Sequence, residues 1–459
     1  MMKYKFEGIL QNKEWLTPGY IHVNENGIIQ SISDKADENS HYALVNGYAL
    51  PGLQNAHSHA FQYAMVGLTE YHNSDNKQDD FWGWRNAMYK IALSVDPDQI
   101  QSIATMLYTE MLKHGYTHVA EFHYVHHQEN GQKYENVSEL GERLIMAAKS
   151  VGIKITLIPI FYQKGGFGQK ASESQRRFIS KNIDEYNKLF LASQISTEQY
   201  EYASIGYGAH SLRAVEPMII KELRENFNGH YPFHIHVAEQ KKEVEQSNQY
   251  LGQRPVQWCL ENLNLDRHCH IVHATHLDQT EIQELAKSQA NVVLCPTTEG
   301  NLADGIFSLL DFQKENGQWS IGTDSHVGIN PFQEMRFLDY GQRVSHFKRS
   351  VFSTGTEYDS GLHAIEKSVI NGRRAMGNDN SEFFKSGESF DALVIDGNSP
   401  LIAVCSPHNL CSTIVYGSDL SMYLGTVVNG KWVIKNGRHA NQINIEKQFS
   451  SSMKQINCR

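Results

Sequence analysis

Two histidines, His57 and His59, lie one residue apart in the segment LPGLQNAHSHAFQ, after an apolar run. In an extended segment, residues i and i+2 point to the same side, so this pair could offer two imidazole nitrogens to one cation. Taken alone, the pair could equally be surface or core histidines. The interpretation as a metal site therefore depends on further ligands elsewhere in the chain.

Two such ligands end later apolar segments. His236 lies in PFHIHVAE, and Asp324 is the last residue of QWSIGTD. Three histidine nitrogens and one aspartate oxygen suit Zn²⁺, with a remaining position left for water. Fe²⁺ could occupy a similar set. The sequence predicts one divalent metal ion, with Zn²⁺ preferred and Fe²⁺ as the alternative, held by His57, His59, His236 and Asp324.

Hydrolytic chemistry at such a metal requires groups that accept and deliver protons. A divalent metal lowers the pKa of its water to roughly 7. Asp324 could accept the proton, and Glu239, three residues after His236, could pass it on as a general acid or base. His273, at the end of CHIVH, could bond the water or the substrate. Taken alone, Glu239 could also be a carboxylate at a helix start, and His273 a buried hydrogen-bonded histidine.

Two arginines near these candidates suggest an anionic substrate. Arg85 lies in the aromatic segment DDFWGWRNAMY, interpreted as a loop after the first strand, and Arg213 lies in HSLRAV. Arginine beside tryptophan can be a plain surface stack, but two such residues on one rim favour carboxylate recognition. Tyr124 offers a hydroxyl, and Gln62 could bond a substrate nitrogen.

The elements that position these residues alternate through the middle of the chain. Strands are predicted at 116–122, 153–161, 232–239, 269–276, 291–296 and 318–324, with helices at 96–115, 137–150, 216–227, 254–263, 278–290 and 330–344. Such alternation is typical of parallel βαβ units, and about eight of them favour a closed (β/α)8 barrel of the TIM type. Reactive residues follow the carboxyl ends of barrel strands, where the candidates lie. The apolar run ending at Pro51-Gly52 is interpreted as the first strand.

Both ends of the chain have β character instead. Residues 3–47 alternate polar and apolar types, and the C-terminal part contains hairpin turns at Asn429-Gly430 and Asn436-Gly437. We therefore expect residues 1–49 and 385–459 to form one small β domain, and residues 50–384 to form the barrel.

Bulk properties narrow the class of protein. The chain has 459 residues and a net charge of −10, which argues against nucleic acid or an anionic membrane as a partner. None of the six cysteines forms a CxxC pair, and no apolar stretch is long enough to cross a bilayer. These features predict a cytoplasmic protein with free thiols.

The strand-end residues resemble those of the amidohydrolase superfamily: His57 and His59 after the first strand, His236 after the fifth, His273 after the sixth and Asp324 after the eighth. The H-x-x-E spacing at 236–239 resembles its mononuclear aminohydrolase branch, which hydrolyses C=N bonds and releases ammonia. Lys154 lies at a strand start, the wrong end of the barrel to bridge two metals. The resemblance implies an α/β fold with a β-sandwich built from both termini, and a homodimer.

Longer motifs narrow the resemblance further. FWGWR, EFHYVHH and AHSLRAV are similar to one enzyme of this branch, whose substrate is a linear amidine carrying two carboxylates. By this resemblance the substrate contacts are Gln62 for the amidine and Arg85, Tyr124, His210 and Arg213 for the carboxylates. Three alternatives stay open: a deaminase of guanine, a triazine or an adenosine-like ring, the lactam-opening enzyme imidazolonepropionase, and a non-catalytic barrel.

Overall fold

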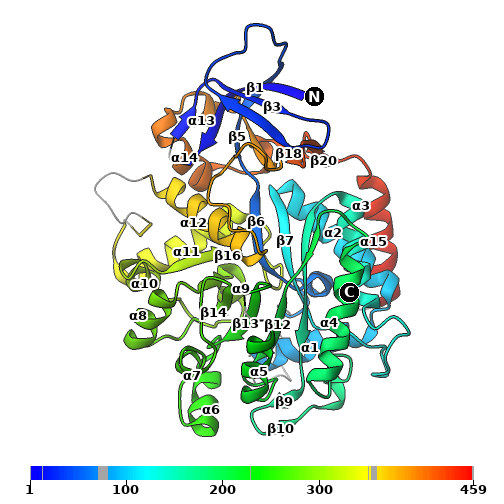
Figure 1. Ribbon diagram of the computed structural model, residues 1–459. Helices are drawn as coiled ribbons and strands as arrows, with labels where there is room; N and C mark the ends of the chain where they lie inside the picture. Colours follow the sequence, from blue (N-terminus) through cyan, green and yellow to red (C-terminus); the bar gives the residue numbers. More distant parts are fainter. Residues whose placement is uncertain are drawn as a thin grey trace.

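Two nine-stranded sheets organise the computed structural model, which describes residues 2–12, 14–70, 81–227, 229–349, 351–352 and 359–456. One sheet is entirely parallel and curves into a barrel, and the other is mainly antiparallel. Figure 1 shows the second sheet, built from blue N-terminal and orange C-terminal segments, above the barrel. The α/β fold with a TIM-like barrel is therefore confirmed.

The barrel contains eight strands in sequence order: β6 (Leu53–Ser58), β7 (Tyr116–His123), β8 (Lys154–Phe161), β12 (Tyr207–Ser211), β13 (Phe233–Val237), β14 (Cys269–His273), β15 (Asn291–Leu294) and β16 (Gln318–Ile321). A short strand, β11 (Ala203–Ile205), also pairs with β8. The amide groups of Thr323 and Asp324, just past β16, donate to the carbonyl of His57 on β6 at 3.1 and 3.0 Å. These bonds bring the end of the last strand beside the first, so the barrel is nearly closed.

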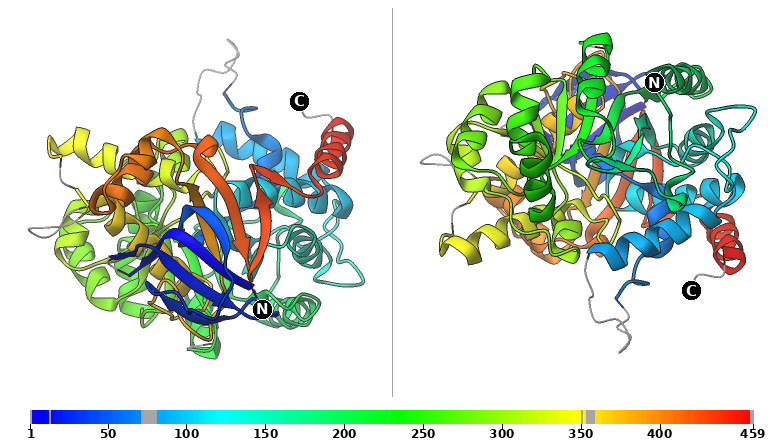
Figure 2. Two further views of the ribbon diagram at one scale, coloured as in Figure 1. Left: turned by 90° about the horizontal axis from the view of Figure 1, so that it is seen from above. Right: turned by 90° about the horizontal axis from the view of Figure 1, so that it is seen from below.

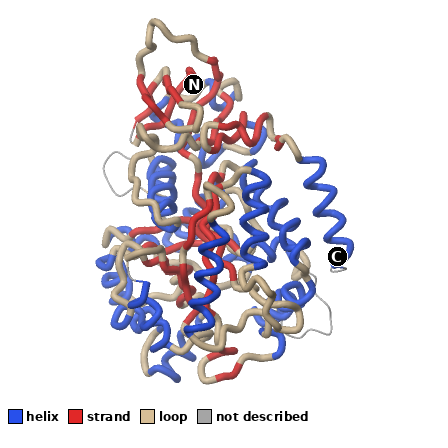
Figure 3. The backbone as a smooth tube through the Cα atoms, turned by 45° about the vertical axis from the view of Figure 1, so that its right-hand side comes forward, coloured by secondary structure: helices blue, strands red, loops and turns tan. Residues whose placement is uncertain are grey.

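Helices enclose these strands, as the blue helices around the red strands in Figure 3 and the view along the barrel in Figure 2 show. They are α1 (Phe81–Ser94), α2 (Pro97–Lys113), α3 (Glu139–Val151), α4 (Ile183–Thr197), α5 (Pro217–Phe227), α6 (Lys241–Leu251), α7 (Pro255–Asn262), α8 (Gln279–Ser288), α9 (Pro296–Asn301), α10 (Leu309–Lys314), α11 (Pro331–His346) and α12 (Ser360–Ala375). The predicted start of α2 is confirmed, because the side chain of Asp96 accepts from the Gln99 amide at 2.8 Å. A two-stranded hairpin, β9 (Lys164–Gly166) with β10 (Gln169–Lys170), follows β8.

The second sheet joins the two ends of the chain. Its strands are β1 (Met2–Gln11), β2 (Glu14–Leu16), β3 (Gly19–Val23), β4 (Ile29–Ser33), β5 (Ala43–Pro51), β17 (Ala392–Asp396), β18 (Tyr423–Val428), β19 (Lys431–Lys435) and β20 (Arg438–His439). The central pairing of β5 with β17 connects the N-terminal and C-terminal segments. The predicted Asn-Gly turns at 429–430 and 436–437 lie between β18, β19 and β20, with positive φ at all four residues.

The first barrel strand differs from the prediction. The apolar run ending at Pro51 is β5, which pairs with β1 and β17 in the second sheet. The barrel begins at β6, after the single intervening residue Gly52. A Cβ atom on Gly52 would lie 2.2 Å from Thr117 Oγ1, so only glycine fits where the chain passes between the sheets. Two consecutive apolar strands that serve different sheets look like one strand in the sequence.

The second sheet lies at the amino ends of the barrel strands. Lys154, the first residue of β8, donates to Asp391 Oδ2 at 2.5 Å, and the Gly52 amide donates to the Asp391 carbonyl at 2.9 Å. The position of Lys154 at the far end from the strand carboxyl ends is as predicted. The opposite rim, which carries β9, β10 and α6 in Figure 1, is therefore free for a site.

The C-terminal part contains helices as well as strands. Short helices α13 (Pro400–Ala403) and α14 (Leu410–Gly417) precede β18, and α15 (Gln442–Ile456) follows β20. Helix α15 packs on α2 of the barrel, as Figure 1 shows in red, and Gln99 donates to Gln455 at 3.4 Å. The division at residues 49 and 385 stays a prediction.

Two further expectations concern the chemistry of the chain. The five cysteines within the described residues are all free thiols, and Cys458 lies outside those residues. None of the helices that the structure describes combines the length and apolar character needed to span a membrane.

Candidate active site

A cavity of about 360 Å³ opens at the carboxyl ends of the barrel strands. All residues predicted for the site line it except His57, which is fully buried behind it: His59, Gln62, Arg85, Tyr124, His210, Arg213, His236, Glu239, His273 and Asp324. These residues come from eight different segments between β6 and the end of β16. The barrel therefore brings together at one cavity the residues that lie between positions 57 and 324 of the sequence.

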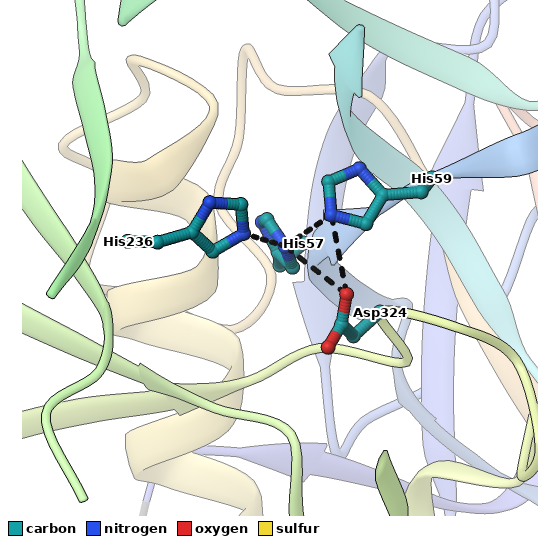
Figure 4. A group of neighbouring side chains, drawn as sticks. All are labelled: His57, His59, His236 and Asp324. Atoms are coloured by element: carbon teal, nitrogen blue, oxygen red, sulfur yellow. Dashed lines mark hydrogen bonds and ion pairs between the residues drawn. The ribbon is translucent and has the colours of Figure 1, made fainter. Parts of the chain in front are cut away.

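Four of these residues form a compact group at the base of the cavity. One nitrogen each of His57, His59 and His236 and one oxygen of Asp324 all lie within 4.8 Å of one another. His57 Nε2 is 3.1 Å from His59 Nε2 and 3.0 Å from His236 Nε2, and Asp324 Oδ1 is 3.2 Å from His59 Nε2. Figure 4 shows the three rings and the carboxylate converging on one point.

The hydrogen bonds made by the Nδ1 atoms of His59 and His236 determine which kind of ligand this group can bind. His59 Nδ1 donates to the Phe122 carbonyl at 2.9 Å, and His236 Nδ1 donates to the His210 carbonyl at 3.0 Å. A neutral imidazole with its proton on Nδ1 presents a lone pair at Nε2. The inner nitrogens of His59 and His236 therefore point lone pairs at the same place. This arrangement fits a metal cation, with the carbonyls orienting the ligands.

Electrostatics keep these side chains in the protonation states that bind metal ions. Burial lowers the pKa of His57 to about 3 and holds the pKa of His236 well below its ordinary value, so both rings are neutral at pH 7. Burial by itself would raise the pKa of Asp324, but contact with His57 and His59 outweighs it and holds that pKa well below its ordinary value. Neutral imidazole and carboxylate are the forms that bind metal ions.

The backbone at the strand ends is strained where it turns these side chains inward. His273, at the end of β14, has φ of 72°, and Asp324, after β16, has φ of 47°. Residues other than glycine rarely adopt this left-handed conformation, and it concentrates at functional sites.

Glu239 and His273 lie beside the group formed by His57, His59, His236 and Asp324. Glu239 Oε1 is 3.8 Å from His273 Nε2, and His273 Nε2 is 3.9 Å from Asp324 Oδ2. Burial alone would lower the pKa of His273, but Glu239, Glu299 and Asp324 outweigh it and raise the pKa to about 10. A protonated His273 donates from both ring nitrogens, so it can hold carboxylates or a substrate oxygen in place.

Gln62 and Tyr124 form a pair on the wall of the cavity. Gln62 lies in the 3-10 helix η1 (Ala60–Met65), and its Nε2 donates to the Tyr124 hydroxyl at 2.9 Å. The Gln62 Oε1 atom is buried and accepts no hydrogen bond from the residues that the structure describes. This oxygen is a free acceptor for an N–H group of a ligand.

The two arginines reach the cavity from different elements. Arg213 follows β12, and its Nη2 lies 3.5 Å from Glu239 Oε2 and 3.6 Å from Glu243 Oε2. Arg85 was expected in a loop, but it lies in α1, where its Nε donates to the Tyr89 hydroxyl at 2.5 Å. Residues 79–80 of the predicted loop lie outside the described residues. The segment begins with aromatic residues and was interpreted as a loop, but it forms an amphipathic helix whose buried face includes Met88 and Ile91.

The sequence interpretation missed three neighbours of the site. Tyr162 directly follows β8 and lines the cavity, so the strand-end rule could have identified it. Glu299 in α9 lies 3.3 Å from His273 Nδ1, and Glu243 in α6 accepts from the Glu239 amide at 3.1 Å. Both act on other residues from helix positions, and no pattern in the sequence marks them.

Known proteins show the same organisation. The model of the amidohydrolase family matches residues 48–433. The chain is 38% identical to formimidoylglutamate deiminase of Pseudomonas aeruginosa, over 96% of this chain and 97% of that protein. A crystal structure of an amidohydrolase from Brucella melitensis is similar with a TM-score of 0.93 and 34% identity, over 100% of both chains. An adenosine deaminase from Xanthomonas campestris with bound zinc, at 18% identity and a TM-score of 0.82 over 100% of this chain and 99% of that one, shares the fold. The chain belongs to the amidohydrolase family.

Proposed function

We propose that the protein hydrolyses N-formimidoyl-L-glutamate to N-formyl-L-glutamate and ammonia. The observation that carries this proposal is that Arg85 and Arg213 line the same cavity as His59, His236 and Asp324. A substrate with two carboxylates offers one anionic group to each of these guanidinium groups. The relative from Pseudomonas aeruginosa, 38% identical over nearly the whole chain, is a formimidoylglutamate deiminase.

The reaction exchanges one C–N bond of the amidine for a C–O bond. The oxygen of water bonds to the amidine carbon, the bond from that carbon to the terminal nitrogen breaks, and the nitrogen leaves as ammonia with the two protons of the water. The chain must therefore hold the amidine carbon near a water and carry protons from oxygen to nitrogen.

We propose that His57, His59, His236 and Asp324 hold a single divalent ion. Zn²⁺ suits three imidazoles and a carboxylate, and Fe²⁺ is the alternative. When bound, such an ion supplies Lewis-acid chemistry that makes water a stronger nucleophile near neutral pH.

The carboxylates beside the ligand group would move the protons. Asp324 has its second oxygen directed toward His273, and Glu239 lies between His273 and Arg213. We assign Asp324 the role of first proton acceptor and Glu239 the role of general acid and base that delivers protons to the leaving nitrogen. His273 would hold both carboxylates and the attacking water in position.

The substrate contacts follow from the walls of the cavity. The free Gln62 Oε1 would accept an N–H bond from the formimidoyl group, with Tyr124 fixing the amide. Arg85, Arg213, Tyr124 and His210 would hold the two carboxylates. Both arginines donate through planar guanidinium groups, which match the geometry of carboxylates.

The alternative functions differ from the proposed one in their substrates and products. A deaminase of guanine, a triazine or an adenosine-like ring acts on a neutral ring, which offers no carboxylate to the guanidinium groups of Arg85 and Arg213 on the cavity wall. Imidazolonepropionase opens a lactam and releases no ammonia. A non-catalytic barrel has no use for a complete set of metal ligands with Glu239 beside them.

A substrate panel tests the proposal. The purified, metal-loaded protein is incubated with N-formimidoyl-L-glutamate, N-formimidoyl-L-aspartate, adenosine, guanine and imidazolonepropionate, and both the ammonia released and the substrate consumed are measured. We expect release from the formimidoyl amino acids, with the glutamate compound preferred. Faster release from a purine would overturn the proposal, and so would consumption of imidazolonepropionate alone.

Three finer assignments belong with this function. We propose that the reaction is a step of bacterial histidine degradation, that the protein works in the cytoplasm and that it is a homodimer. Light scattering on the purified protein tests the homodimer, since a mass of one 52.2 kDa chain would contradict it.

A further inference from the structure

Glu121 lies outside the predicted site but touches the segment that carries two of the metal ligands. It belongs to β7, is 2% exposed and lies beside β6, which ends with His57 and Ser58. Its Oε2 atom accepts from the Ser58 hydroxyl at 2.6 Å, and its Oε1 atom accepts from the Ala60 amide at 2.6 Å. Ser58 and Ala60 are the two neighbours of His59, so one carboxylate fixes the chain on both sides of this ligand.

A third hydrogen bond holds the carboxylate itself. Tyr108, a fully buried residue of α2, donates its hydroxyl to Glu121 Oε2 at 3.0 Å. All three partners are donors, and a carboxylate with its acceptor-only oxygens suits such a set. Glu121 is therefore held between a helix behind β7 and the histidine segment in front of it.

The opposite side of the segment is fixed by the backbone. The Thr323 and Asp324 amides donate to the His57 carbonyl, and the His59 amide donates to the Asp324 carbonyl at 3.1 Å. These bonds tie the histidine segment to the residue that supplies the carboxylate ligand. Glu121 is the side-chain counterpart on the β7 side, and it can be changed by mutation.

We infer that Glu121 is a positioning residue that sets the relative orientation of His57 and His59 as metal ligands. The inference rests on the proposed function only through its metal ligands and not through the identity of the substrate. Residues that orient metal ligands typically change metal affinity by about 10- to 100-fold when removed. The side chain does not line the cavity, so it acts through the histidines.

Two substitutions of Glu121 distinguish a role in positioning the histidines from a role in packing alone. In Glu121→Gln, the amide oxygen can still accept from Ala60 while its nitrogen donates to the Ser58 hydroxyl. In Glu121→Leu, the size is similar but all three bonds, from Ser58, Ala60 and Tyr108, are lost. We expect Glu121→Leu to weaken metal binding roughly 10- to 100-fold, and Glu121→Gln to retain affinity within a smaller factor.

A matched control is Glu281→Leu. Glu281 is also 2% exposed and accepts from the amide groups of Gln257 and Asp278, but it lies in α8, away from the ligands. Loss of this buried carboxylate should lower the melting temperature of the metal-free protein and leave metal affinity unchanged.

The experiment measures the dissociation constant of Zn²⁺ by competition with a chelator, together with the rise in Tm on metal binding and the visible spectrum of the Co²⁺-loaded protein. We expect Glu121→Leu to show weaker binding, a smaller metal-induced rise in Tm and an altered Co²⁺ spectrum. A folded Glu121→Leu variant with wild-type affinity and spectrum would overturn the inference, as would an equal loss in Glu281→Leu.

Ser58→Ala keeps the test decisive if Glu121→Leu does not fold. It removes the bond from Ser58 to Glu121 and a longer contact of 3.4 Å between Ser58 and His326 Nε2, and it leaves the bond from Ala60 to Glu121 in place. We expect several-fold weaker Zn²⁺ binding. Wild-type affinity in Ser58→Ala would then overturn the inference. No substrate is present in these measurements, so an incorrect substrate assignment leaves their result unchanged.

Discussion

Arg213 Nη2 lies 3.5 Å from Oε2 of Glu239, the residue proposed to deliver protons to the leaving nitrogen. The same guanidinium is 3.6 Å from Glu243 Oε2. Burial alone would lower the pKa of Arg213, but Glu243 and Glu239 outweigh it and raise that pKa, so the charge is retained. In the proposed mechanism, substrate binding and proton transfer therefore meet at Arg213, and a substrate carboxylate would share this residue with Glu239.

Replacement of this arginine should weaken substrate binding. We predict that Arg213→Ala lowers kcat/KM for N-formimidoyl-L-glutamate roughly 30- to 1000-fold. This corresponds to a loss of about 2–4 kcal/mol of transition-state stabilisation, because a buried charge pair loses one partner. Most of the change should appear in KM, measured by initial rates of ammonia release. Arg143→Ala, which removes a pair with Asp98 and Glu139 on α2 and α3, is the control and should behave like wild type. Normal turnover by Arg213→Ala would exclude it as a carboxylate contact.

Gln62 and Tyr124 should act as a unit. Gln62→Leu removes the buried acceptor. We expect kcat/KM to fall by a factor that corresponds to about 1.5–3 kcal/mol, the free energy contributed by a hydrogen bond to a charged group. Tyr124→Phe removes the hydroxyl that fixes the Gln62 amide. The double variant should therefore lose less than the sum of the two single losses. Strict additivity in this double-mutant cycle would mean that the 2.9 Å bond between them has no part in substrate binding.

Metal removal should abolish activity reversibly. We expect dialysis against a chelator to give a folded, inactive protein that regains activity with one equivalent of Zn²⁺ per chain. Metal analysis of His236→Ala should show loss of the ion, because this residue supplies one of only three imidazoles in the group. Metal binding to the native state alone should also raise Tm, by an amount that grows with the logarithm of the free ion concentration once this exceeds Kd. Full turnover by the metal-free protein is incompatible with the proposed site.

The contact between Lys154 and Asp391 should contribute to stability in a pH-dependent manner. Burial alone would raise the pKa of Asp391, but Lys154 and the Asn429 amide outweigh it and hold that pKa below its ordinary value. A lowered native pKa stabilises the fold above the unfolded carboxyl pKa of about 3.9, and this contribution is lost as the pH falls through the native value.

Asp391→Asn should therefore cost about 3 kcal/mol at pH 7, because it leaves Lys154 without its partner. Urea unfolding should show the difference from wild type shrinking as the pH falls below 4. Asp311→Asn, which breaks an exposed pair with Lys314, is the control and should change stability by less than about 1 kcal/mol. If the difference in free energy of unfolding between Asp391→Asn and wild type is the same at pH 7 and below pH 4, the effect comes from packing and not from charge.

The sequence predicted most of the barrel because strand and helix patterns are local. The predicted strand 116–122 agrees with β7 (Tyr116–His123), and the candidate ligands follow strands whose carboxyl ends must share one rim. The apolar run before Gly52 was assigned to the wrong sheet, since sheet membership depends on partners far away in the chain. Helix α15 was expected as part of a β segment, because its packing on α2 is equally non-local.

The residues of the site likewise divide into those that a local rule predicts and those that it does not. Residues at strand ends, such as His236 and Asp324, could be predicted from one rule about barrels. Glu243 and Glu299 could not, because each lies in a helix and not at a strand end, and each touches another residue of the site. Glu121 shows a third case: its position in β7 was predicted, but its bonds to Ser58 and Ala60 depend on the pairing of β6 with β7.

The most direct measurement follows both products of one reaction. Metal-loaded protein is incubated with N-formimidoyl-L-glutamate, and ammonia and N-formyl-L-glutamate are quantified over time. We predict that the two appear in equal amounts from the first turnover, since the bond to the terminal nitrogen is the one that breaks. Release of formamide and glutamate, or no release of ammonia at all, would contradict the proposed function.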